Sequence, residues 1–206
     1  MFVRALCSLL LFSGMVNAGT VDIRITNQFG EPLANAVVEI LQPEQPTAAA
    51  DTVYVYQQDL AFNPFVTAIP VGTYVNFPNL DKTRHHVFSF SPAKTFEIKL
   101  FVGKPRDPIL FDKPGIVALG CNIHDNMQAF IYVGTSHQLA VTNAQGIASF
   151  TLPDTFDYQI KLWHPWQLQD HPEQQISSVS PTLAFSMTVD AIDDPTIPPK
   201  GFGNSY

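Results

Sequence analysis

The chain has 206 residues, of which 46% are hydrophobic and only 14% charged, enough for one large or two small domains with their own cores. The formal net charge is −7, and no basic patch or interleaving of basic with aromatic residues is seen in the sequence. Both observations argue against nucleic acid as a partner.

Residues 1–18, "MFVRALCSLLLFSGMVNA", have the layout of a secretory signal peptide. Arg4 precedes an apolar run over 5–12, and the Val16-x-Ala18 ending predicts cleavage after Ala18. The run is too short for a membrane span in the mature chain, although a retained N-terminal anchor is the alternative. We therefore expect an exported, periplasmic protein.

Removal of this segment takes Cys7 away and leaves Cys121 as the only cysteine. It also removes Arg4, which leaves ten basic and eighteen acidic side chains and a mature charge of about −8. A single thiol cannot form an internal disulfide, and in an oxidising compartment it needs to be buried or ligated.

Helical periodicity is nearly absent, and short alternating runs separated by Gly, Pro and Asn predict an all-β chain. Alternate residues are apolar over 21–25 and 36–40, with a turn over 27–30 between them. "PEQPTAAAD" (43–51) is typical of a linker. At least three strands follow over 52–90.

The segments "GIVALG" (115–120) and "QAFIYV" (128–133) predict two strands that enclose the loop 121–127. Two more strands are expected over 139–165, around a turn at 143–146. In 183–189 alternate residues point inward, which places Met187 in a core. The tail 193–206 has no periodicity, and we expect it to be disordered.

The loop 121–127 carries Cys121, His124 and Met127 at three-residue steps. A structural zinc site would need four strong ligands and an iron–sulfur cluster several cysteines, which a chain with one remaining thiol does not have. A thiolate and two imidazoles in a plane, with a long axial thioether, form a blue-copper site. The loop therefore predicts one copper ion; burial in a core is the alternative for Cys121 and Met127.

Such a site needs a second histidine, and "NLDKTRHHVFSF" (79–90) offers His85 and His86. In a strand His85 shares a face with Val87, and His86 shares the opposite face with Phe88. Alternation alone leaves both histidines open as the ligand.

"GTYVNFPNLDKTRHHV" (72–87) and "FDKPGIVALGCNIHDNMQAFIYV" (111–133) resemble the two ligand-bearing segments of cupredoxins, with a short loop similar to that of amicyanin. The resemblance implies a Greek-key sandwich over 50–135. It also implies that His85 joins Cys121, His124 and Met127 as copper ligands. Nearby residues that it places around the ligands are Asn79, Asp81 and His86, the last standing where the family has asparagine, serine or threonine.

The flanking segments, 21–40 and 140–165, resemble the two halves of a carboxypeptidase regulatory-like domain. The resemblance implies an Ig-like or transthyretin-like sandwich split into 19–42 and 136–192, with the cupredoxin domain inserted between its halves. The alternative is two consecutive domains, with 20–42 as an extra hairpin on the first.

The resemblance implies an exported protein of the methylamine-utilisation type that carries single electrons and is not an enzyme, because protein ligands leave no open position on the ion. Electrons would pass through His124 to a dehydrogenase or a c-type cytochrome. The expected docking rim consists of Asn122, Ile123, Asp125 and Asn126. Copper delivery or sensing, and a non-redox β-sandwich interaction module, are the alternative functions.

Overall fold

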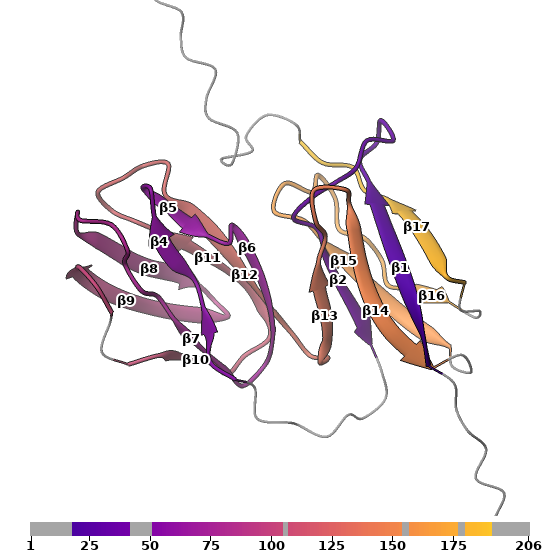
Figure 1. Ribbon diagram of the computed structural model, residues 1–206, viewed down its shortest axis with the longest axis horizontal. Coiled ribbons are helices and arrows are strands. Elements are labelled where there is room, and N and C mark those ends of the chain that lie inside the picture. Colours follow the sequence, from indigo (N-terminus) through magenta and orange to yellow (C-terminus); the bar gives the residue numbers. More distant parts are fainter. Residues whose placement is uncertain (1–17, 42–50, 105–106, 154–156, 177–179, 191–206) are drawn as a thin grey trace, which may run out of the picture.

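A computed structural model describes residues 18–41, 51–104, 107–153, 157–176 and 180–190, and these residues form seventeen β-strands and no helix (Figure 1). The predicted all-β class is confirmed. Within this part of the chain, no helix is available that could cross a membrane. The expected signal peptide, linker and tail lie outside the described residues, apart from the border residues Ala18 and Asp51.

The middle of the chain forms two facing sheets and a small hairpin. The five-stranded sheet has the order β6-β12-β11-β8-β9, and the three-stranded sheet has the order β10-β7-β3. Their hydrophobic side chains share one core, which includes Phe77, Phe111 and Ile131 together with Cys121 and Met127. The bounds are β3 (Val53–Tyr54), β4 (Tyr56–Gln58), β5 (Ala61–Asn63), β6 (Val66–Pro70), β7 (Thr73–Asn76), β8 (His85–Ser91), β9 (Lys94–Phe101), β10 (Ile109–Phe111), β11 (Gly115–Gly120) and β12 (Gln128–Gly134).

Strands from the two ends of the described chain form a second pair of sheets. The first strand pairs with β14 antiparallel and with β17 parallel, and β2 lies between β13 and β15, with β16 beyond. Met187 belongs to the core between these sheets, as expected. The bounds are β1 (Ala18–Thr26), β2 (Val37–Leu41), β13 (Gln138–Val141), β14 (Ile147–Pro153), β15 (Tyr158–Trp163), β16 (Gln174–Ile176) and β17 (Thr182–Ser186). The domain boundaries stay a prediction.

The second strand is buried on both faces, whereas the sequence predicted only one apolar face. Val38 and Ile40 point into the core of the outer sheets, as predicted. Val37 instead belongs to the core of the central sheets. The sheet that contains β2 therefore lies between the two cores, and the left and right halves of Figure 1 meet along it.

Glu39 points from β2 toward the central sheets and is only 1% exposed. Its carboxylate accepts hydrogen bonds from the Tyr132 hydroxyl at 2.5 Å, the Thr135 amide at 2.7 Å and the Ser136 amide at 2.9 Å. Buried carboxylates require such partners, because an unpaired one carries a large desolvation penalty. Gly134 leaves room for this carboxylate, since a Cβ there would lie 2.8 Å from Glu39 Oε1. The polar contact joins β2 to the end of β12.

We predict that Tyr132→Phe lowers the free energy of unfolding by about 1–3 kcal/mol, because Glu39 loses a buried donor. Burial and the Glu39 hydrogen bond raise the pKa of Tyr132 above its usual value. The unfolded phenol ionises first as the pH rises, so the wild type loses stability at alkaline pH and the variant loses less. Urea unfolding at pH 7 and at about pH 11 measures both effects. The exposed Tyr74→Phe is the control; equal stability of the two variants would contradict the role of Glu39.

Candidate metal centre

The predicted loop 121–127 connects β11 to β12, two antiparallel neighbours in the five-stranded sheet. Its base is closed by the Cys121 amide, which donates to the Met127 carbonyl at 3.1 Å, and the Met127 amide donates to the His124 carbonyl at 3.0 Å. These bonds hold the three residues in one tight turn. Cys121 is buried, and its thiol is free of any disulfide.

His85 begins β8 and is fully buried. Gly120 of β11 pairs with Phe88 of β8, and the Phe88 ring lies over it. A Cβ at Gly120 would lie 2.9 Å from the Phe88 ring. The missing side chain therefore leaves room for the Phe88 ring beside the start of the loop.

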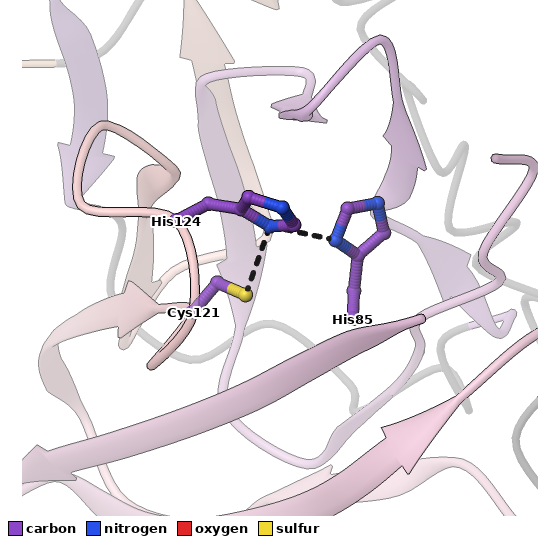
Figure 2. A group of neighbouring side chains, drawn as sticks. All are labelled: His85, Cys121 and His124. Atoms are coloured by element: carbon purple, nitrogen blue, oxygen red, sulfur yellow. Dashed lines mark hydrogen bonds between the residues drawn. The ribbon is translucent and has the colours of Figure 1, made fainter. Parts of the chain in front are cut away.

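His85, Cys121 and His124 form one cluster, in which the potential ligand atoms all lie within 4.8 Å of one another. The Nδ1 atoms of the two histidines are 3.2 Å apart, and the Cys121 Sγ lies 3.6 Å from His124 Nδ1 (Figure 2). Each of the three is a ligand type suited to a transition metal. The cluster could hold one metal ion.

Asp81 fixes the orientation of the His85 ring. Its Oδ2 accepts a hydrogen bond from His85 Nε2 at 2.7 Å, which leaves the Nδ1 lone pair directed at the cluster. Burial of this carboxyl opposes its ionisation, but the hydrogen bonds from His85 and from two backbone amides outweigh burial and lower the pKa of Asp81. Asp81 thus acts on His85 as the carboxylate that orients a metal-binding histidine.

The two amides belong to Asp59 and Leu60, which lie 2.8 and 3.1 Å from the Asp81 carboxylate. They form the two-residue turn between β4 and β5, with φ of 55° and 61°. Sequence reasoning missed this contact. The signal available was an aspartate between two short strands, because asparagine and aspartate are favoured where such a turn needs positive φ.

His86 lies outside the cluster. Its Nε2 bonds to Glu97 Oε1 of β9 at 2.9 Å, and its ring lies 5.4 Å from that of Phe88. Asn79 fixes the loop before His85, because its side-chain amide donates to the carbonyls of Thr83 and Phe101. Of the two adjacent histidines, only His85 points toward Cys121 and His124.

Met127 is 1% exposed and belongs to the same core as Cys121. The predicted docking residues are all exposed, and His124 between them is partly exposed. These docking residues are Asn122, Ile123, Asp125 and Asn126. The loop thus places one imidazole between a buried thiol and the solvent.

No protein-family model and no curated protein matches this chain. Among solved structures it is similar to a copper-containing nitrite reductase from Thermus scotoductus SA-01, at 27% identity over 47% of this chain and 25% of that one, with a TM-score of 0.39. A purple cupredoxin from Nitrosopumilus maritimus matches at 20% identity over 40% of this chain and 99% of that one, with a TM-score of 0.35. A reduced variant of amicyanin matches at 19% identity over 47% of this chain and 98% of that one, with a TM-score of 0.38.

This chain therefore spans a quarter of the nitrite reductase and nearly all of the two smaller proteins. Each likeness covers less than half of this chain at a TM-score below 0.5. The function must be inferred from the metal centre itself.

We predict that Asp81→Asn weakens metal binding by about 10- to 100-fold, the usual effect of removing a carboxylate that orients a ligating histidine. Titration of the purified protein with Co(II) or Cu(II) measures the change. Asp112→Asn is the control, because Asp112 is an exposed aspartate paired with Lys94. Equal affinities of the two variants would mean that Asp81 does not support the site.

Proposed function

We propose that the protein binds one copper ion through His85, Cys121, His124 and Met127. The observation that carries this proposal is the cluster of one thiol and two imidazoles, with all ligand atoms within 4.8 Å of one another. Copper accepts thiolate, imidazole and thioether together, whereas structural zinc takes four strong ligands. The buried thioether of Met127, fixed through its backbone to the same loop, completes the donor set.

The protein would transfer single electrons, because a bound copper ion supplies a one-electron couple. Four protein ligands would leave no position for a substrate, which favours a carrier over an enzyme. The surrounding hydrogen bonds support this function: Asp81 fixes His85, and the Met127 carbonyl and amide fix the ends of the loop. Ligands that keep their places in both oxidation states lower the reorganisation that accompanies transfer.

Electrons would enter and leave at His124, the partly exposed ligand. Its neighbours Ile123 and Asn122 would contact the partner over a small surface, as is usual for transient redox encounters. The signal-peptide layout of residues 1–18 supports a periplasmic location for this activity. A dehydrogenase or a c-type cytochrome is the class of partner proposed.

The ligand assignment predicts that the Cu(II) protein has the intense visible absorption of a thiolate–copper bond. Cys121→Ser and His85→Ala should lose that band, because each removes a ligand in the trigonal plane. His86→Ala is the matched control and should keep it, since the His86 ring bonds to Glu97 outside the cluster. Absorption spectra of all four proteins at equal copper load make the comparison.

A colourless wild type would end the blue-copper assignment. A band that survives in His85→Ala and vanishes in His86→Ala would exchange the roles of the two histidines.

A further inference from the structure

Basic residues are unevenly distributed along this acidic chain. Seven of the eleven Lys and Arg residues lie within 82–113, against three of the eighteen Asp and Glu residues. That stretch carries a local charge of +4, the difference of these two counts, while the whole chain carries −7. The basic residues are separated by uncharged ones, which is why the sequence shows no basic patch.

The fold brings part of this charge to one edge of the metal centre. The loop before His85 pairs with the turn after β9, since the Asn79 amide donates to the Gly103 carbonyl at 2.7 Å and the Gly103 amide donates back at 3.2 Å. This isolated antiparallel bridge brings together the two segments that carry Leu80 and Val102, the residues next to its two partners. The exposed Lys82, Arg84 and Lys104 lie on the same two segments.

Apolar side chains accompany the basic ones. Leu80 is 58% exposed, Val102 53% and Leu60 51%. The amide of Leu60 bonds to Asp81, which places the β4–β5 turn beside the same loop. We call this surface the basic edge; it consists of Leu60, Leu80, Lys82, Arg84, Val102 and Lys104.

The charges of the basic edge are not used inside the chain. Among the described residues, the ion pairs of lysine and arginine are limited to Lys94 with Asp112. Nearby acidic groups are Asp59 in the β4–β5 turn and Asp125 in the ligand loop, both exposed, and Asp81, which is bonded to His85. Glu97, also exposed, bonds to His86. Lys82, Arg84 and Lys104 therefore have no ion-pair partner among the described residues.

We propose that the basic edge is a docking surface for a partner protein that presents acidic side chains around an apolar contact. This inference rests on the proposed electron transfer. A partner anchored on loop 79–84 would be held beside the cluster, because Asp81 of that loop bonds to His85. The Nδ1 atom of His85 lies 3.2 Å from that of His124, the proposed point of electron entry. Complementary charge raises the rate of encounter and orients the partner. The half-exposed leucine and valine side chains give the edge an apolar component. This component favours a protein partner over a ligand that would bind through phosphate groups alone.

The salt dependence of the reaction rate distinguishes steering by the basic edge from repulsion by the net charge of the chain. A chain of net charge −7 repels an acidic partner, so the rate would rise as salt screens the repulsion. A partner steered by the basic edge would instead react more slowly as salt is added. Added salt therefore lowers the rate if the basic edge steers the partner and raises it if the net charge of the chain dominates.

The first experiment maps anion binding on the metal-free protein by NMR with hexacyanochromate(III), a redox-inert paramagnetic anion. Amide signals of 80–84 and 102–104 should broaden, and Lys82→Glu with Lys104→Glu should abolish that broadening. Lys161→Glu, an exposed reversal on β15, should leave it unchanged. Broadening centred elsewhere, or none, overturns the proposal. Because no copper is present, this result stands apart from the colour of the copper protein.

The second experiment follows electron exchange between the copper-loaded protein and a cytochrome c made acidic by succinylation of its lysines. One electron passes between copper and haem. The rate constant should fall about tenfold as ionic strength rises from about 0.01 to 0.3 M. The double variant Lys82→Glu, Lys104→Glu should reverse the trend and Lys161→Glu should keep it. A wild-type rate that rises with salt overturns the proposal. The proposal is also overturned if the wild type binds phosphatidylglycerol vesicles in a salt-sensitive way and the double variant does not. That result would assign the edge to a membrane.

Discussion

The hydrogen bond between Asp81 and His85 is the contact on which the geometry of the candidate metal centre depends. At 2.7 Å it fixes a fully buried imidazole so that Nδ1 faces the loop that carries Cys121 and His124. The same carboxylate accepts the amides of Asp59 and Leu60, and so it ties the β4–β5 hairpin to loop 79–84. One side chain therefore positions a ligand, a turn and the inner border of the basic edge. Loss of this contact would affect metal binding and partner docking together.

The rest of the molecule supports this arrangement through backbone structure. The ligand loop starts and ends on β11 and β12, which are paired along their length, and β8 pairs with β11 at Gly120. At its far end β12 meets Glu39 of the outer sheets through Tyr132. The strand that follows the ligand loop is thus held at both ends, which would keep the proposed ligands in place in both oxidation states. The outer sheets stabilise that strand without contributing to the metal cluster.

The sequence allowed the strands around the loop, the loop itself and the all-β class to be predicted, because alternation and turn residues are local signals. Strand alternation could not decide between His85 and His86, and only the family resemblance favoured His85. In the structure the two histidines differ in their tertiary partners, because His85 bonds to Asp81 and His86 bonds to Glu97. Nor could the sequence predict that β2 is buried on both faces, because Glu39 reads as a solvent-facing residue until its donors are known. The basic edge was missed for a similar reason: its residues come together only when Asn79 pairs with Gly103.

An electron carrier of this design holds one copper ion with the same protein ligands in both oxidation states. X-ray absorption spectra of the copper-loaded protein, recorded oxidised and then chemically reduced, measure these ligands. We expect one short sulfur and two nitrogen ligands in each state, with nearly unchanged distances. Absence of the sulfur ligand, or replacement of a nitrogen ligand when the protein is reduced, would contradict an electron carrier built on His85, Cys121 and His124.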